Sequence, residues 1–477
     1  MTNNIHEECG VFGIYSNETR DVAKTAYYSL YALQHRGQES AGIVVNDDGV
    51  FTVKKALGLV SDAFSQKDFE ALGTGNISVG HVRYATTGSD SFQNIQPIVV
   101  NHNKGRMALA HNGNLTNSYE LREKLEENGA IFHSTTDSEV IAYIIVQQRL
   151  KYGSIEEAVS ASMEIIKGAY SLVISSPSKL IAVRDPNGFR PLCYGKTEDG
   201  SFVFASESCA LDAVNAKIER DLLPGEIAIV EDGKIRFDTS HCNKSRKSTC
   251  VFEYIYFARP DSVIDGKSVS LARQQAGRFL ALEHAVDADV VIGVPDSGLE
   301  AALGYSAESH IPYAIGFTKN KYIGRTFISP EQSSREKGVN IKLNPIKDVV
   351  NGKRIVLVDD SIVRGTTSRR IVDLLWEAGA KEIHMRISSP AFIAPCYYGT
   401  DIDDANKLIA NKHSVEEIAG IIGVTSLGYL SKEHVCLLTG EDSGFCTACF
   451  DGRYPVEPSS NSKKSRFEQK ISERKKE

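Results

Sequence analysis

Short hydrophobic runs separated by turn residues fill the first half of the chain, and they are rich in Val, Ile and aromatic residues. This pattern is typical of β-strands, and it predicts strands at 10–15, 42–45, 77–83 and 171–175. Apolar residues recur at helical spacing in 21–32 and 138–152, which predicts two helices there. The mixture, which contains no internal repeat, predicts stacked sheets with helices on their outer faces.

The pattern changes after the polar stretch DTSHCNKSRKST (238–249), which has no periodicity and predicts a linker. Beyond it, strand, loop and helix alternate, as in a parallel α/β sheet. Strands are predicted at 290–294, 354–358 and 383–387, one helix from about Thr367 to Gly379, and another from Ser414, where Glu417 completes a capping box. The tail from Pro458 is rich in Ser, Lys, Arg and Glu, which predicts disorder.

Length and composition narrow the function classes. A chain of 477 residues predicts two or three domains. A net charge of -7 argues against a broad nucleic-acid-binding face. The N-terminus has neither the basic nor the apolar region of a signal peptide, and no apolar run is long enough to cross a bilayer. We therefore expect a cytoplasmic protein without membrane or nucleic-acid partners, whose nine cysteines are thiols, metal ligands or a nucleophile rather than disulfides.

The strongest local signal in the second half is RIVLVDDSIVRGTTSRR. A buried strand delivers Asp359 and Asp360 at its carboxyl end, where open α/β sheets bind ligands. The loop Arg364-Gly365-Thr366-Thr367-Ser368 then enters a helix, and its hydroxyls, N–H groups and helix dipole suit a phosphate. Adjacent carboxylates suit a ribose diol or Mg²⁺. The alternative is an ordinary helix start in which Asp and Thr are caps. The loop lacks the lysine of a Walker P-loop, which argues against ATP hydrolysis.

This segment resembles the phosphoribosyl pyrophosphate (PRPP) motif of type I phosphoribosyltransferases. The resemblance implies that Asp359 and Asp360 hold the ribose and Mg²⁺, and that residues 364–368 bind the 5-phosphate. It also implies that Ser297, in the loop after the strand at 290–294, lies near Mg²⁺, and that the basic segment with Lys319, Lys321 and Arg325 closes on pyrophosphate. Taken alone, the first of these segments is a turn and the second an exposed basic stretch.

Cys9 begins the first half, and a single cysteine near a chain start is by itself most often a buried structural residue. Four later segments change this interpretation, since together, and in this order, they resemble the glutaminase domain of N-terminal-nucleophile amidotransferases. They are HRGQES (35–40), GHVRYAT (80–86), HNGNL (111–115) and DSE (137–139).

That resemblance implies an αββα fold in which Met1–Glu8 is a propeptide and Cys9 is the nucleophile, with its own α-amino group as the base. Arg83 would bind the glutamine α-carboxylate and Asp137 the α-ammonium, while Asn112 and the N–H of Gly113 would form the oxyanion hole. Taken singly, Arg83 could instead form a salt bridge, Asp137 could cap a helix, and Asn112-Gly113 could form a turn.

The two halves together resemble the amidophosphoribosyltransferase (glutamine PRPP amidotransferase) family over nearly the whole chain. The expected parts are a propeptide (1–8), a glutaminase domain (9–240), a phosphoribosyltransferase domain (250–456) and a tail (458–477). The resemblance implies the first committed step of purine biosynthesis: ammonia from glutamine displaces pyrophosphate from PRPP, giving 5-phosphoribosylamine and glutamate. It also implies feedback inhibition by purine nucleotides and a homotetramer. Two other hypotheses are a PRPP-sensing regulator without catalysis and a stand-alone glutaminase with a scaffold half.

Four further cysteines form a candidate metal site. In the iron–sulfur branch of the family, matching positions bind a [4Fe–4S] cluster, and here they are Cys250, Cys396, Cys446 and Cys449. Four thiolates also suit zinc, and the residues alone do not separate the two metals. Because these cysteines join the linker to the C-terminal CxxC, we expect a structural rather than a redox role. The remaining four, Cys193, Cys209, Cys242 and Cys436, match no ligand position.

Overall fold

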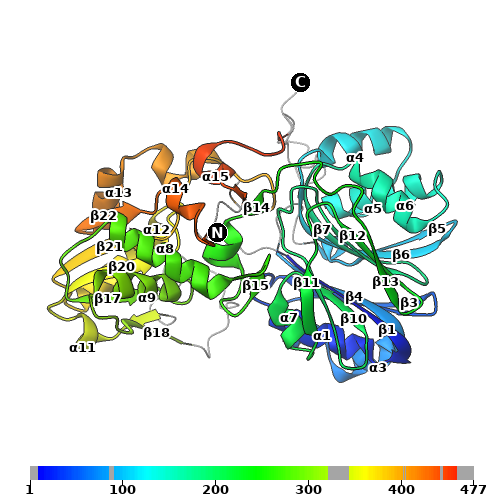
Figure 1. Ribbon diagram of the computed structural model, residues 1–477, viewed down its shortest axis with the longest axis horizontal. Coiled ribbons are helices and arrows are strands. Elements are labelled where there is room, and N and C mark those ends of the chain that lie inside the picture. Colours follow the sequence, from blue (N-terminus) through cyan, green and yellow to red (C-terminus); the bar gives the residue numbers. More distant parts are fainter. Residues whose placement is uncertain are drawn as a thin grey trace.

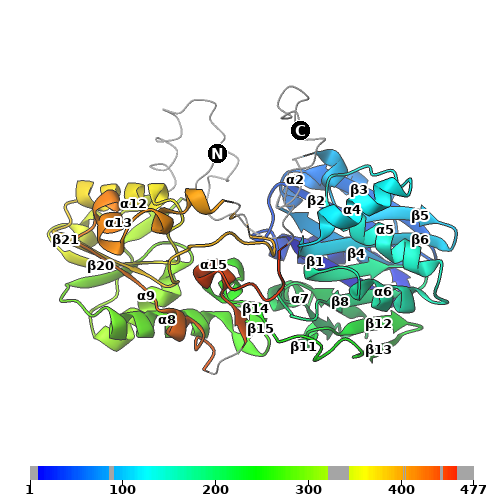
Figure 2. The ribbon, with the colours of Figure 1, turned by 90° about the horizontal axis from the view of Figure 1, so that it is seen from above.

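The computed structural model describes residues 9–84, 91–320, 343–400, 402, 404–440 and 444–458. Two lobes lie side by side, with α15 (Ala448–Asp451) and β14 (Thr249–Cys250) between them (Figures 1 and 2). The predicted propeptide 1–8, residues Lys321 and Arg325 of the basic segment, and tail residues 459–477 lie outside the described residues. No helix in the described ranges is both long and apolar enough to cross a membrane.

Two antiparallel sheets form the first lobe. The seven-stranded sheet has the order β11 (Lys217–Asp221), β9 (Cys193–Lys196), β10 (Phe202–Ala205), β1 (Gly10–Arg20), β4 (Gly75–Arg83), β2 (Ser40–Asp47), β3 (Val50–Leu57). The six-stranded sheet has the order β13 (Lys234–Asp238), β12 (Ile227–Glu231), β8 (Leu180–Arg184), β7 (Gly168–Ser175), β6 (Gly105–Leu115), β5 (Ile98–His102). Side chains alternate between the two faces of each strand. In β1, Val11 and Tyr15 therefore pack between the sheets, while Phe12 and Ile14 pack against the outer helices.

Helices cover the outer face of each sheet. The seven-stranded sheet carries α1 (Val22–Ala32), α2 (Val60–Ala63), α3 (Gln66–Leu72) and α7 (Ser208–Asp212), and the six-stranded sheet carries α4 (Ser118–Glu127), α5 (Asp137–Arg149) and α6 (Ile155–Met163). This is the predicted four-layer αββα arrangement. Asp21 caps α1 by accepting from the N–H of Lys24, so the predicted helix from residue 21 is correct to one residue. The other predicted helix starts one residue earlier than expected and ends at Arg149, before the glycine turn at 153.

A parallel sheet forms the centre of the second lobe, in the order β17 (Val290–Gly293), β20 (Arg354–Asp359), β21 (Glu382–Ile387), β22 (Ser426–Tyr429). One face packs against α8 (Val269–Glu283) and α9 (Gly298–Ser309), and the other against α12 (Thr366–Glu377) and α13 (Val415–Ile422). Burial on both faces explains why these strands are continuous apolar runs. The predicted parallel α/β fold is thus confirmed, as is the capping box of Ser414 and Glu417.

Smaller elements complete the second lobe. They are β15 (Val263–Ile264), β16 (Lys267–Ser268), β18 (Phe317–Lys319), β19 (Leu343–Pro345), β23 (Phe445–Cys446), α11 (Lys347–Val350), α14 (Lys432–Val435) and the one-turn π-helix η2 (Glu253–Phe257). The indole N–H of Trp376 in α12 donates to the carbonyl of Gly423 at 2.8 Å, which joins α12 to the end of α13.

The C-terminal segment returns to the start of the second lobe. Strands β14 and β23 pair in parallel, with Thr249 opposite Phe445 and Cys250 opposite Cys446. Residues 239–248, which contain neither helix nor strand, precede β14. Segments almost 200 positions apart in the sequence therefore meet between the lobes, near residues of both.

Candidate active sites and a cysteine-lined pocket

A pocket in the first lobe contains most of the residues expected to act on glutamine. It holds about 240 Å³ of empty space and is lined by Cys9, Arg83, Tyr84, Gln96, His111, Gly113, Thr136, Asp137 and Ser138. Cys9 immediately precedes β1, Arg83 ends β4, Gly113 lies in β6 and Asp137 starts α5. Both sheets and one helix start therefore contribute to one pocket, which is why residues from four separate sequence segments meet there.

A thiol and a carboxylate both line this pocket. The Cys9 thiol donates to the carbonyl of Tyr84 at 3.4 Å. Asp137 Oδ2 accepts from the N–H of Leu115 at 2.9 Å, and its Oδ1 lies 3.6 Å from His111 Nδ1. Burial would raise the pKa of Asp137, but the His111 charge and these hydrogen bonds outweigh it and hold the pKa below its ordinary value. An ionised Asp137 is suited to bind an ammonium group.

Gly113 lines the same pocket, and Asn112 is its neighbour in β6. The side-chain amide nitrogen of Asn112 is buried and has no hydrogen-bond partner within the described part of the chain. A buried donor without a partner is costly, and it points to a ligand acceptor. Gly113 has φ +136°, and a Cβ there would lie 2.2 Å from the carbonyl oxygen of Ala169 on β7. Only glycine fits this position.

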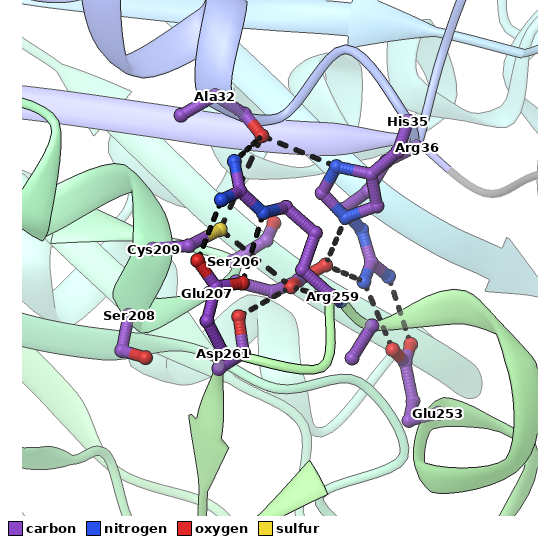
Figure 3. A network of polar contacts seen from close by, with 12 residues as sticks. Ala32, His35, Arg36, Ser206, Glu207, Ser208, Cys209, Glu253, Arg259 and Asp261 are labelled. Carbon is purple, nitrogen blue, oxygen red and sulfur yellow. Dashed lines mark hydrogen bonds and ion pairs between the residues drawn. The ribbon is translucent and has the colours of Figure 1, made fainter. Parts of the chain in front are cut away.

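Behind Cys9 lies a buried ion network that the sequence analysis did not identify (Figure 3). Arg36 is fully buried, and its Nε donates to the carbonyl oxygen of Cys9 at 3.1 Å. Its two Nη atoms donate to Glu207 at 2.6 Å and to Glu253 at 2.8 and 2.9 Å. Arg36 stands inside the quoted HRGQES segment, and Glu253 lies three residues after Cys250. Nothing else in the sequence indicated that Arg36 and Glu253 form a network.

In the second lobe the paired carboxylates lie where the sequence placed them, at the carboxyl end of β20. Asp359 and Asp360 are buried, the Asp360 N–H donates to Asp359 Oδ1 at 2.9 Å, and the hydroxyls of Ser297 and Ser361 donate to Asp360. Burial raises the pKa of both carboxyls, and the charge of Asp360 raises that of Asp359 further. Carboxylates and a hydroxyl of this kind are hard oxygen ligands, which fit Mg²⁺.

The expected phosphate loop follows. Gly365 has φ +79° and is the N-cap of α12, so Thr366, Thr367 and Ser368 occupy the first turn of that helix. The backbone N–H groups in the first turn of a helix and the positive end of its dipole favour an anion. A Cβ at Gly365 would lie 2.9 Å from the Cδ1 of Ile409, so a side chain there is strained in both conformation and space. Arg364 precedes the loop, and Lys319, at the end of β18, pairs with Asp296.

The four candidate cluster ligands line a second pocket, which lies between the lobes. Cys250, Cys396, Cys446 and Cys449 surround it with Phe252, Phe392 and Tyr398, among others, and it holds about 410 Å³ of empty space. Burial raises the pKa of Cys446 to about 12, and burial together with the other three thiols raises that of Cys449 further. Within the described residues no three His, Cys, Asp or Glu side chains converge closely enough for a single metal ion. Four cysteine thiols around one pocket are the donor set that an iron–sulfur cluster requires.

The other four cysteines take no part in this pocket. Cys193 and Cys209 are buried in the core of the first lobe, Cys436 packs against the core of the second, and Cys242 is half-buried. None of the nine cysteines, all of which lie in the described part of the chain, forms a disulfide.

Comparison with known proteins adds independent information on both lobes. A glutamine amidotransferase domain model matches residues 81–213, and a phosphoribosyl transferase domain model matches residues 271–388. The amidophosphoribosyltransferase of Methanocaldococcus jannaschii is 50% identical over 94% of this chain and 98% of its own. A solved structure of the glutamine PRPP amidotransferase from B. subtilis, in complex with ADP and GMP, superposes with a TM-score of 0.89 at 45% identity, covering 96% of this chain and 99% of that one. Another, described as the allosteric regulatory enzyme of purine biosynthesis, gives 0.90 at 45% identity over 97% and 99%.

Proposed function

The chain belongs to the amidophosphoribosyltransferase family, which carries out glutamine-dependent amidotransfer to PRPP in purine biosynthesis, and we propose that it does so with Cys9 and the Asp359–Ser368 segment. The products are 5-phosphoribosylamine, glutamate and pyrophosphate. The observation that carries the assignment of residues is the grouping of Cys9, Arg83, Gly113 and Asp137 in one pocket, within a chain whose other lobe holds the paired aspartates.

At the first site Cys9 attacks the side-chain amide carbon of glutamine. Its base is its own α-amino group, which becomes free when Met1–Glu8 is removed and whose ordinary pKa near 8 suits proton transfer. Arg83 binds the α-carboxylate and Asp137 the α-ammonium. Asn112 Nδ2 and the N–H of Gly113 donate to the oxyanion of the tetrahedral intermediate, which is supported by the buried amide of Asn112 that lacks a described partner. Ammonia leaves, and water hydrolyses the thioester to glutamate.

At the second site the ammonia displaces pyrophosphate from C1 of the ribose. Asp359, Asp360 and Ser297 would hold Mg²⁺, which when bound neutralises charge on the leaving pyrophosphate. Arg364, Gly365, Thr366, Thr367 and Ser368 bind the 5-phosphate through the N-terminus of α12. Lys319 and Arg325 close over the pyrophosphate and exclude water, which would otherwise hydrolyse the sugar.

Cys250, Cys396, Cys446 and Cys449 would hold a [4Fe–4S] cluster that ties the start of the second lobe to its C-terminal segment. Their position around one pocket and the pairing of β14 with β23 support this assignment. Four thiolates would also suit zinc, and the resemblance to the iron–sulfur branch of the family favours the cluster. Its contribution is structural, because the reaction transfers no electrons.

Three wider features follow from the same family. ADP and GMP are bound by the B. subtilis relative, which supports purine nucleotides as feedback inhibitors of this chain too. We place the enzyme in the cytoplasm, in keeping with the absence of a membrane-spanning helix from the described residues. We also propose a homotetramer.

One assay tests the assignment of the two sites. Pyrophosphate release from PRPP is measured with glutamine and, separately, with ammonium. The parent should use both, and Cys9→Ala should lose the glutamine-dependent rate and keep the ammonium-dependent one. A PRPP-sensing regulator would show neither rate, and a stand-alone glutaminase would release glutamate without pyrophosphate. Glutamine-dependent turnover by Cys9→Ala would exclude Cys9 as the nucleophile.

A further inference from the structure

Arg36, which is fully buried, contacts the backbone of the proposed nucleophile. Its Nε donates to the Cys9 carbonyl oxygen at 3.1 Å, across 27 positions of sequence. Arg36 does not line the glutamine pocket, so it has no described contact with the space where glutamine would lie. Its effect on the reaction therefore passes through Cys9.

Cys9 has a specific need for such a contact. Once Met1–Glu8 is removed, Cys9 is the first residue, and a chain end frays unless something holds it. The ladder between β1 and β4 begins only at Gly10, opposite Val82. The Arg36–Cys9 hydrogen bond therefore fixes the one residue that the strand leaves outside its ladder. Thiol and α-amine both extend from that residue, and a nucleophile displaced by about 1 Å loses on the order of 10²-fold in rate.

Arg36 keeps its buried place only because carboxylates compensate its charge, since an unpaired buried ion costs several kcal/mol. One carboxylate, Glu207, belongs to the first lobe. The other, Glu253, belongs to η2 in the second lobe and makes two hydrogen bonds to Arg36. Glu253 also accepts from Arg190 at 3.3 Å, and Arg190 donates to the carbonyl oxygen of Tyr398 at 2.8 Å. Burial would raise the pKa of Glu253, but the neighbouring Arg36 lowers it, so the carboxyl is ionised.

We propose that Arg36 is a positioning residue for Cys9 and that Glu253, from the other lobe, holds Arg36 in place, so that the glutaminase site is complete only when the second lobe is docked. This inference rests on the proposed role of Cys9. Glu253 acts on the first half-reaction without contacting glutamine, PRPP or Cys9. The ammonium-dependent reaction, which bypasses Cys9, does not need the pair.

The test uses the full chain with the substitutions Arg36→Gln, Glu253→Gln and both together. We expect kcat with glutamine to fall by about 10–100-fold while KM for glutamine changes by less than about 3-fold, because Arg83 and Asp137 are untouched. The ammonium-dependent rate should stay near that of the parent. If the two residues act as one unit, the double variant should lose no more than the worse of the two single variants. Glu253→Asp, which keeps the charge, should recover part of the loss.

Arg184 provides a matched control. It is fully buried and pairs with Asp265 at 2.6 Å, so it too joins a strand of the first lobe to the second lobe, but it has no described contact with Cys9. Arg184→Gln should lower the thermal midpoint and leave the ratio of glutamine-dependent to ammonium-dependent rates unchanged. The N-terminal mass of every variant is measured to establish that Cys9 is exposed.

The outcomes separate this inference from the proposed function. The inference about Arg36 and Glu253 is overturned if their variants keep the parental kcat with glutamine, or if they lose the glutamine-dependent and ammonium-dependent rates equally. It is also overturned if Arg184→Gln changes the ratio of these rates in the same way, or if the variants retain residues 1–8. If Arg36→Gln does not fold, Glu253→Gln and Glu253→Asp decide by the same rate ratio, and equal ratios in parent and both variants overturn it. Glutamine-dependent turnover by Cys9→Ala would instead refute the proposed function itself.

Discussion

The hydroxyl of Ser297 donates a hydrogen bond to Oδ2 of Asp360, although 63 positions separate the two residues. Ser297 follows β17 and Asp360 follows β20, and these strands are parallel neighbours, so their carboxyl ends share one edge of the sheet. The contact joins the proposed pyrophosphate loop to the proposed ribose-binding carboxylates. Two parts of the proposed PRPP site are therefore in direct contact at this edge of the sheet.

The first prediction concerns Asp360, one of the two paired carboxylates. Asp360→Asn removes charge from the site expected to hold Mg²⁺ and the ribose, and we expect pyrophosphate release to fall by about 10²-fold or more with either glutamine or ammonium. The substitution keeps the shape of the side chain, so the thermal midpoint should not fall. A variant that lost only glutamine-dependent turnover would contradict the role given to this carboxylate.

Asn112→Ala removes one proposed oxyanion donor. We expect kcat with glutamine to fall by roughly 10²–10³-fold while the ammonium-dependent rate is kept. Asn46→Ala is a suitable control, because Asn46 is equally buried in the same lobe but donates to Ser175 and Ser176 and is absent from the glutamine pocket. The control should lower stability and leave kcat unchanged; similar kinetics for the two variants would refute the assignment.

Lys55 should make the stability of the folded protein depend on pH. Burial lowers the pKa of Lys55 on β3 to about 8, and the charge of Glu139 only partly opposes it. Between pH 8 and the unfolded value of 10.5 the unfolded chain binds a proton that the folded chain has lost, so stability gains with rising pH in that window. Below pH 8 both states are protonated and the folded one carries the full cost of a buried charge.

Lys55→Met removes the cost of burying the Lys55 charge, and with it this pH dependence of stability. At pH 7 the variant should melt a few degrees higher than the parent, by about 2–4 °C for each kcal/mol recovered. The difference should shrink steadily as the pH rises from 8 towards 10.5, as followed by scanning calorimetry. A difference between the two proteins that does not depend on pH would show that Lys55 is charged throughout.

The thermal stability of the protein should depend on a metal cluster in the cysteine-lined pocket. Cys449→Ser should abolish binding of iron and acid-labile sulfide and lower the thermal midpoint, because the group that ties β14 to the C-terminal segment is lost. Cys436→Ser is the control, since Cys436 lies outside the pocket and should change neither quantity. Parent protein prepared without oxygen that contained zinc and no iron would contradict the assignment to iron–sulfur.

Much of the site could be predicted because its residues stand in short, distinctive segments. Cys9, Arg83, Asn112 and Asp137 were named from such segments, and the fold brings three of them into one pocket, which Gly113, the neighbour of Asn112 in the chain, also lines. The contact between Arg36 and Glu253 could not be predicted in the same way. It spans 217 positions of sequence, and a buried ion pair leaves no periodic pattern along the chain.

Helix boundaries show a second limit. Asp137 was assigned to glutamine from its segment, yet the helix it begins was predicted from Ser138, because acidic residues fit both a first turn and the position before it. The structure shows that one residue starts α5 and also faces the pocket. Local sequence patterns predicted the helices and strands well, whereas the contacts between the lobes could be found only in the folded structure.

Trp376 is the one tryptophan of the sequence, and it lies on α12, the helix whose first turn forms the proposed phosphate loop. Its indole, partly exposed and bonded to the end of α13, is the sole source of tryptophan fluorescence in the whole chain. The native protein thus carries its own optical reporter in the second lobe, and the first lobe contributes no tryptophan background. A change in tryptophan emission during a ligand titration of the unlabelled enzyme therefore originates in the second lobe.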